Sequence, residues 1–460
     1  MSPILRPAKR KFGRTDPQAG RYALPGFPVD APERLRELFA RTGLAEALAF
    51  PGTPAKAGSA EAVLQALFLG GEALPAAAFP DAERFRAAGL LEVFGGLARS
   101  RFKVQSYEGL FLLSDLPARN AARDYVLQVG PAGHYLARLT VRRRVESALD
   151  LGCGCGVQAL LAARHAARVT ATDINPRALA LTAFNAALSG IPNVELLEGS
   201  FFEPLRGRRF DLIVANLPYV IAPPERTVYR RAEGRGDTRL RRLVRQMPAF
   251  LDPGGYAHLL ANWVQTGPDP SRALRAALRG APADAWLIVN GSKQMEPYAR
   301  MWLEPAPDDR RTLETWLDWY RRQGIGRVAL GALTLRRRGR GRPRFETAEV
   351  LTALQSPAGD QFERLFAAGD ALAGLGRTER LLDRVLLPEA LELDEDCLRV
   401  PAAAGLGLQA RVRPGTLRVL QALDSRSSLR TIVERTCPAE SAAVLADFTE
   451  LVRLGMVRLG

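Results

Sequence analysis

The chain has few histidines and cysteines, three and four in 460 residues. The cysteines form no Cys-x-x-Cys pair; they are Cys153, Cys155, Cys397 and Cys437. The histidines are scattered; they are His134, His165 and His258. Zinc-ligand spacing is therefore absent, so we expect reduced thiols and no metal site. A disulfide scaffold is excluded as a fold class.

Long apolar runs are also missing. No stretch reaches 18 uninterrupted apolar residues, so no membrane-spanning helix is expected. The amino-terminal sequence MSPILRPAKRKFGR lacks the apolar core of a secretory signal. We therefore expect no membrane association and a cytoplasmic location.

Acidic residues are outnumbered, 49 against 64 basic ones, which gives a formal net charge of +15. Such an excess favours nucleic acid or another acidic partner, although a general bias toward arginine would produce it too. Hydrophobic residues make up 47% and charged residues 25%, as in globular proteins. The length suggests about three folded domains.

The pattern changes along the chain. Residues 99–115 suggest two short strands around the turn Tyr107-Glu108-Gly109, after a helical stretch. Beyond the run RRRGRGRPR, three helices and a closing strand are expected. The predicted organisation is a flexible basic arm (1–28), a helical, winged-helix-like domain (29–118), an α/β domain (119–338), a basic linker (339–347) and a second winged-helix-like domain (348–460).

The α/β domain is predicted from short apolar runs, several of them separated by helical segments. These runs are SALDLG, RVTATD, VELLEG, FDLIVAN, YAHLLAN, AWLIVN and RVALGALTL. Alternation of this kind is typical of a mostly parallel sheet covered by helices on both faces.

A glycine-rich turn follows the first of these runs, in the sequence Ala148-Leu-Asp-Leu-Gly-Cys-Gly-Cys-Gly156. Glycine permits positive φ and lets a ligand approach the backbone closely. Taken alone, the pattern also fits a dinucleotide-binding loop.

The ends of three further strands help to decide which ligand the glycine-rich loop binds. Asp173 ends the second strand, 21 residues after Gly152, where an acid can bind ribose hydroxyls. The third strand ends before Ser200-Phe201, where an adenine would fit, and the fourth ends in Asn216-Leu-Pro-Tyr219. Since ligands bind at the carboxyl ends of strands in open α/β sheets, these residues are expected to share one site.

Residues 120–265 resemble a class I S-adenosylmethionine-dependent methyltransferase. More narrowly, they are similar to the amino-methyltransferases with an Asn-Pro-Pro-Tyr/Phe motif, a group that includes HemK-type glutamine methyltransferases and related RNA guanine and DNA adenine methyltransferases. The resemblance covers about a third of the chain and implies a Rossmann-like, mostly parallel seven-stranded sheet.

The resemblance implies S-adenosylmethionine as cofactor, with the glycines around its methionine part and Asp173 on its ribose. The segment Gly133–Thr140 matches the place where relatives close over the cofactor. Cofactor-binding residues are predicted to be His134, Thr140, Asp150, Gly152, Cys153, Gly154, Gly156, Asp173, Ile174, Ser200, Phe201 and Asn216. Two departures stand out: Ser200 replaces a common acid, and Leu217 replaces the first proline of the motif.

The motif suits a planar nitrogen, whose delocalised lone pair makes it a poor nucleophile. The Asn216 side-chain oxygen and the backbone carbonyl of Leu217 can hold two N–H groups and orient the nitrogen. Tyr219 would stack on the planar group. Asn216, Leu217, Pro218 and Tyr219 are therefore the predicted catalytic residues. The alternative is that Asn216 caps a turn and Tyr219 only packs.

Arginine suits phosphate through bidentate hydrogen bonds, so several arginines are predicted to bind the acceptor. The predicted substrate-binding residues are Tyr219, Arg226, Arg230, Arg231, Arg235, Arg340 and Arg342. The first arginine group would form a loop beside the site, or else a solvated helix face. Arg340-Gly-Arg-Pro343 resembles an AT-hook core, or else is a basic interdomain loop.

The leading expectation is an N-methyltransferase acting on an exocyclic amino group of a DNA or RNA base. The alternative is methylation of a glutamine side-chain amide (N5) in a protein, which the same motif serves. A further alternative is a non-catalytic nucleic-acid-binding protein that keeps the fold. Nucleic acid or a protein substrate is thus the expected partner.

Overall fold

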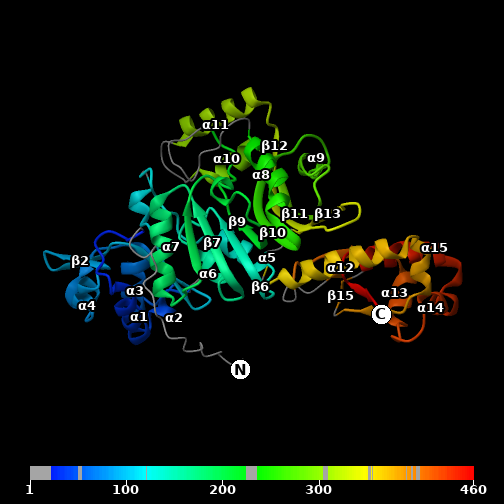
Figure 1. Cartoon of the computed structure of the whole chain (residues 1–460), viewed down its shortest axis with the longest axis horizontal. Coiled ribbons are helices and arrows are strands. Elements are labelled where there is room, and N and C mark those ends of the chain that lie inside the picture. Colours follow the sequence, from blue (N-terminus) through cyan, green and yellow to red (C-terminus); the bar gives the residue numbers. More distant parts are fainter. Residues whose placement is uncertain are drawn as a thin grey trace.

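A computed structural model gives the architecture (Figure 1). It describes residues 22–49, 54–120, 122–223, 236–303, 309–350, 354, 356–389, 391–394, 397–399 and 405–460. Most of the predicted basic arm, and all of Arg226, Arg230, Arg231 and Arg235, lie outside these ranges. An amino-terminal module (blue) and a carboxyl-terminal module (orange to red) lie at opposite ends of the molecule, with a large sheet between them.

The sheet has eight strands in the order β13-β11-β12-β10-β9-β6-β7-β8. Only β12 is antiparallel to its neighbours, β10 and β11. The strands are β6 (Val145–Leu151), β7 (Ala166–Asp173), β8 (Val194–Glu198), β9 (Phe210–Ala215), β10 (Leu251–Val264), β11 (Ala283–Gln294), β12 (Arg327–Arg337) and β13 (Phe345–Glu349). The mostly parallel α/β prediction is confirmed.

One strand more than predicted is present. Phe345–Glu349, partly assigned to a linker, pairs in parallel with β11, beginning with Phe345 opposite Ala285. Its residues are mostly half-buried and only two are large or β-branched, so they carry no clear strand signal. Backbone pairing at the edge of the sheet, rather than burial, creates this strand.

Helices cover both faces, which explains the continuous apolar runs in the strands. Alternate residues of β6 and β9 face opposite sides: Ala148 and Leu212 belong to one apolar core, Leu149 and Ile213 to the other. On the first side lie α5 (Pro131–Leu139), α6 (Val157–Ala162) and α7 (Pro176–Leu188). On the second lie α8 (Thr238–Gln246) and α9 (Arg272–Ala277), while α10 (Met295–Trp302) and α11 (Asp309–Gln323) share a third core.

The amino-terminal module combines short helices with two small sheets. Its helices are α1 (Ala31–Thr42), α2 (Leu44–Ala47), α3 (Ala60–Gln65) and α4 (Ala82–Ala87). Its strands are β1 (Leu74–Pro75), β2 (Leu91–Phe94), β3 (Leu97–Ser100), β4 (Lys103–Tyr107) and β5 (Leu110–Ser114). Strands β4 and β5 pair as a hairpin at the place where two strands were predicted. The module packs against α7, whose last carbonyls at Ala187 and Leu188 accept hydrogen bonds from Arg36 on α1.

The carboxyl-terminal module begins with α12 (Gly359–Leu375). Its other helices are α13 (Pro414–Gln421), α14 (Leu429–Thr436) and α15 (Ser441–Arg453). Its strands are β14 (Leu386–Pro388), β15 (Glu392–Asp394), β16 (Cys397–Arg399), β17 (Gln409–Arg411) and β18 (Val457–Leu459). The winged-helix interpretation of both modules stays a prediction.

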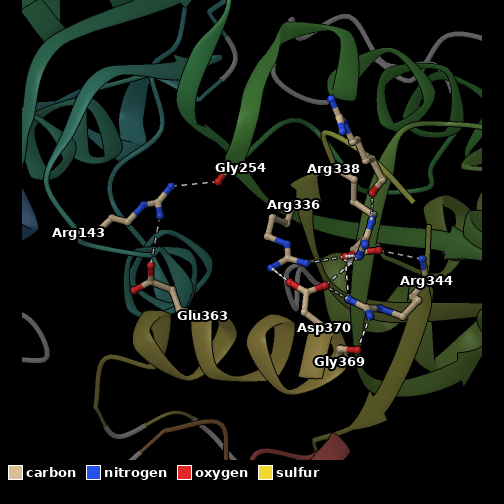
Figure 2. Close-up of polar contacts among 10 residues, drawn as sticks. Arg143, Gly254, Arg336, Arg338, Arg344, Glu363, Gly369 and Asp370 are labelled. Atoms are coloured by element: carbon tan, nitrogen blue, oxygen red, sulfur yellow. Dashed lines mark hydrogen bonds and ion pairs between the residues drawn. The ribbon is translucent and has the colours of Figure 1, made fainter. Parts of the chain in front are cut away.

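An ionic cluster fastens α12 to the sheet (Figure 2). Arg336, Arg338 and Arg344 all bind two carboxylates, Asp284 of β11 and Asp370 of α12, over N–O distances of 2.6 to 3.1 Å. The Asp284 side chain is 1% exposed, whereas that of Asp370 is 43% exposed. Three cations converge on one buried acid and one exposed acid.

We expect these two carboxylates to differ sharply in their contribution to stability. Asp284→Asn leaves three arginines without their buried partner and should lower the free energy of unfolding by about 3 kcal/mol. Asp370→Asn should lower it by less than about 1 kcal/mol, because water screens an exposed group. Urea denaturation at pH 7 measures both, and equal losses would contradict the difference.

The pH dependence provides the check on Asp370. Burial acts to raise its pKa, but hydrogen bonds from Arg336 and Arg344 outweigh it and hold the pKa at about 2. Its stabilising effect is therefore present above about pH 4 and is lost as the pH falls from 4 toward 2. The difference in stability between wild type and Asp370→Asn should shrink over that range.

Candidate active site

The glycine-rich loop lies directly after β6 and turns sharply. Gly152, Gly154 and Gly156 have φ values of +79°, +56° and +89°. The amides of Gly152 and Cys153 both donate to the Thr172 carbonyl of β7, at 2.8 and 2.9 Å. These bonds hold the loop at the carboxyl edge of the sheet, in a conformation that favours glycine.

The three glycines differ in their surroundings. A Cβ at Gly156 would lie 2.8 Å from Thr182 Cγ2, and one at Gly152 would lie 2.8 Å from Leu217 Cδ2. A Cβ at Gly154 would meet no protein atom within 4 Å. The backbone at Gly154 is therefore open on the side where a cofactor would approach.

Asp173, at the end of β7, binds this loop. One carboxylate oxygen accepts from Gly154 N at 3.0 Å and the other from Asn175 N at 2.9 Å. Burial raises the Asp173 pKa, while these N–H groups act to lower it. Since each carboxylate oxygen has a second acceptor site, Asp173 can also take two ribose hydroxyls. The loop and the acid thus fit S-adenosylmethionine.

Asp150, the second acid near the loop, is 2% exposed. Its carboxylate accepts from Ala159 N at 2.8 Å, which ties β6 to α6. Burial, reinforced by the charge of Asp173, raises the Asp150 pKa to about 7. Asp150 therefore stabilises the loop by joining the strand before it to the helix after it.

We expect Asp150 to make stability fall as the pH rises. Its pKa in the fold, about 7, exceeds the unfolded value of about 3.9. Its contribution is complete below pH 4 and is lost as the pH rises from 4 to 7, by up to about 4 kcal/mol. Asp150→Asn keeps an acceptor for Ala159, so its stability relative to wild type should rise over that interval in denaturation curves. A constant difference would contradict the assignment.

The Asn-Leu-Pro-Tyr motif lies next to the loop, as predicted for the end of β9. The close approach of Leu217 to Gly152 joins the two segments. Asn216 also faces α5, because its Nδ2 lies 4.0 Å from the Cβ position of Gly133. The structure therefore brings together the loop, Asp173 and the motif.

Aromatic residues of α10 and α11, which no motif in the sequence marks, support Asn216-Leu-Pro-Tyr219. Tyr219 lies edge-on to Trp302 of α10, with ring centroids 5.9 Å apart. Tyr298 Oη accepts from Ile221 N at 2.9 Å, and Tyr320 Oη donates to Ile221 O at 2.7 Å. Burial raises the Tyr219 pKa to about 12, so its ring stays neutral. No sequence spacing linked these helices to the motif.

The turn after β8 carries Ser200 and Phe201, the residues predicted to lie near the adenine. Phe201 has φ +49°, and the Arg239 guanidinium lies 4.9 Å from the centroid of its ring. Ser200 and Phe201 are half-buried, and Ile174 beyond Asp173 is 57% exposed. These positions share the carboxyl edge with the loop.

A polar residue missed in the sequence completes the loop. Thr182 of α7 is fully buried, and its Oγ1 lies 3.1 Å from Gly154 O and 3.3 Å from Cys153 Sγ. A hydroxyl within the mainly apolar stretch ALALTAF of α7 was the available signal. Burial raises the pKa of both loop thiols, that of Cys155 to about 12, which fits packing rather than redox chemistry.

Two residues of the predicted segment Gly133–Thr140, one in α5 and one just after it, make other contacts. The His134 ring packs on Tyr107 of β4 at 4.1 Å, and burial lowers its pKa to about 4. Thr140 lies about 10 Å along the helix from Gly133. Its carbonyl abuts Gly359 of α12, and its hydroxyl donates to Leu136 O. The structure does not bring Thr140 to the cofactor edge.

Arg340 and Arg342 also lie apart from the site. They follow the end of β12, which is antiparallel to β10, with Arg336 opposite Tyr256. They therefore lie at the amino edge of the sheet, opposite the glycine-rich loop. Arg338 Nε donates to the Arg340 carbonyl, and Gly341 turns with φ +87°. The structure therefore does not bring Arg340 and Arg342 to the edge that carries the motif, and their role in acceptor binding stays a prediction.

A groove of about 480 Å³ opens at the same edge as the motif, at the ends of β10 and β11 and the start of β12. Polar residues dominate its lining, among them Gln265, Gln294, Glu296, Arg321 and Arg327. Within the described ranges, no three acidic, histidine or cysteine side chains gather to hold a metal ion. The same ranges contain no helix long and apolar enough to cross a membrane.

Comparison with known proteins agrees with this geometry. Residues 132–277 match the methyltransferase small domain family. The release factor glutamine methyltransferase of Xylella fastidiosa (strain 9a5c) is 37% identical over 147 residues, 29% of this chain and 50% of that protein. The ribosomal protein uL3 glutamine methyltransferase of Bradyrhizobium diazoefficiens is 40% identical over 143 residues, 27% of this chain and 43% of that protein.

A relative with an RNA acceptor in its name is also found. The ribosomal RNA small subunit methyltransferase C of Alcanivorax borkumensis is 29% identical over 157 residues, covering 34% of this chain and 42% of that protein. The chain thus spans about half the length of these relatives, or less. Its matched part contains β6 to β9 with the glycine-rich loop, Asp173 and Asn216. Residues 132–277 therefore match a methyltransferase small domain, and their sheet has the fold of a class I, S-adenosylmethionine-dependent methyltransferase.

Proposed function

We propose that this protein methylates the side-chain amide nitrogen of glutamine in a protein acceptor. The observation that carries the proposal is the juxtaposition of Asn216-Leu-Pro-Tyr219 with Gly152 at the cofactor edge. Two relatives named as glutamine methyltransferases, 37% and 40% identical over this region, support the amide over a nucleic-acid base. The base amino group, our first expectation, is supported by the more distant RNA relative at 29%.

The chemistry follows from the motif. S-adenosylmethionine, when bound, supplies an electrophilic methyl group on a sulfonium. The Asn216 side-chain oxygen and the Leu217 carbonyl accept the two N–H hydrogens of the amide, which points its nitrogen at that methyl. Transfer of the methyl group to the nitrogen would convert the sulfonium to a thioether, and one N–H proton would leave to water. The same two oxygens stabilise the positive charge that develops on nitrogen.

Two further features suit a polypeptide acceptor. Tyr219, neutral and half-buried, offers a flat surface to the planar amide. The groove at the ends of β10 and β11 offers the Gln294 amide, a group that can pair with an extended backbone. We infer that residues flanking the target glutamine lie in this groove.

A labelling experiment tests the acceptor class. The protein is incubated with methyl-labelled S-adenosylmethionine and an extract from cells that lack it, and the products are treated separately with DNase, RNase and protease. We expect only protease to release the label. Release by a nuclease would contradict the proposal and restore the base amino group as acceptor.

A further inference from the structure

Asp115, immediately after β5, is a fully buried carboxylate with partners from three places. Arg177 of α7 donates from Nε to both oxygens, at 3.1 and 3.0 Å, and from Nη2 at 2.5 Å. Arg119 Nη1 donates at 2.9 Å, and Val126 N donates at 2.9 Å. The amino-terminal module and α7 thus share one acid.

These contacts close a loop between the module and α5. The Asp115 amide donates to the Val126 carbonyl at 3.1 Å, so that the two residues exchange hydrogen bonds. Within the loop, Arg119 Nη2 donates to Asp124 at 3.0 Å. These bonds hold Asp115 and Val126 together, with Asp115 at the base of the loop.

This loop meets the turn that carries Asp173. Asn175 Nδ2 donates to the Asp124 carbonyl at 2.9 Å, while Asn175 Oδ1 accepts from Arg177 N at 3.0 Å. The backbone N–H of Asn175 in turn donates to Asp173 Oδ1. A continuous chain of hydrogen bonds runs from the Asp115 loop through Asn175 to the acid that faces Gly154.

We propose that Asp115 is a positioning residue for the cofactor site; this rests on the S-adenosylmethionine chemistry of the proposed function. Arg177 is the second residue of α7, at the positive end of the helix dipole, where a cation is unfavourable. The Asp115 carboxylate neutralises it and holds it in place. The turn Asp173–Arg177 then keeps the orientation in which Asp173 can receive the ribose.

Cofactor affinity, measured by isothermal titration calorimetry on the full chain with S-adenosylmethionine and no acceptor, tests the assignment. Asp115→Asn should raise the Kd at least about tenfold. With acceptor, the KM for S-adenosylmethionine should rise by the same factor, while kcat at saturating cofactor changes less than about threefold. A merely structural role would lower Tm without this split.

Arg36→Met is the matched control, because Arg36 ties the same module to the opposite end of α7. It should change Kd by less than about twofold. If Asp115→Asn does not fold, Arg177→Lys serves, since lysine keeps the charge but cannot make the bidentate contact. Unchanged Kd in these Asp115 or Arg177 variants, or an equal rise in Arg36→Met, would overturn the assignment. A wild type that binds cofactor but methylates no glutamine would overturn the proposed acceptor alone.

Discussion

Replacing Asn216 by alanine is expected to lower kcat about 100- to 1,000-fold, the effect of removing one group that stabilises charge in a transition state. The Kd for S-adenosylmethionine should stay within about twofold of wild type, because the loop and Asp173 remain. The loss of kcat is expected because alanine removes one of the two acceptors that would orient the amide. Single-turnover kinetics and calorimetry measure the two quantities separately.

Asn193→Ala provides the control for this experiment. Its side chain donates to the carbonyls of Ala163 and Ala166, between α6 and β7 at the amino edge of the sheet. Loss of these bonds should reduce stability by about 1 kcal/mol and leave kcat unchanged. If Asn216→Ala loses cofactor affinity and turnover by the same factor, Asn216 holds the cofactor and not the acceptor.

The second large effect is expected at Gly154. Alanine there would project into space free of protein atoms, so the free energy of unfolding should fall only by the backbone strain of positive φ, about 1 kcal/mol. The added methyl group would occupy the space through which the cofactor reaches the loop. We therefore expect the Kd for S-adenosylmethionine to rise at least about tenfold.

Two other glycines serve as comparisons. Gly207 has φ +77° and equally open surroundings, but it lies at the amino edge, before β9. Gly207→Ala should therefore cost similar stability without changing the Kd. Gly156→Ala should lose the most stability of the three variants, about 2–3 kcal/mol relative to wild type, because its Cβ collides with Thr182. Equal Kd values for the Gly154 and Gly207 variants would show that the loop does not cradle the cofactor.

The site core could be predicted because its signals are local. Positive-φ glycines, an acid at the end of the next strand and a polar motif at the end of another each stand beside an apolar run. Parallel strands then bring their carboxyl ends together. The register Asp150–Ala171 and Asp150–Val214 places Gly152, Asp173 and Asn216 at one edge.

The remaining features depend on contacts between distant parts of the chain. Arg340 and Arg342 follow the antiparallel strand β12, whose direction their charge does not reveal. Thr140 faces α12, more than 200 residues later in the chain. Asp115 lies 62 residues before Arg177 and carries no motif of its own. In each case tertiary packing determines where the residue lies, and no local sequence spacing predicts it.

The most direct test of the central claim identifies the methylated atom. Protein labelled in the presence of this chain from methyl-labelled S-adenosylmethionine is hydrolysed in strong acid, and the volatile amines are collected. Cleavage of an N-methylated glutamine amide gives glutamate and methylamine, so we predict that the label appears as methylamine. Label that remains on an amino acid, or on a nucleic-acid base, would contradict glutamine as the acceptor.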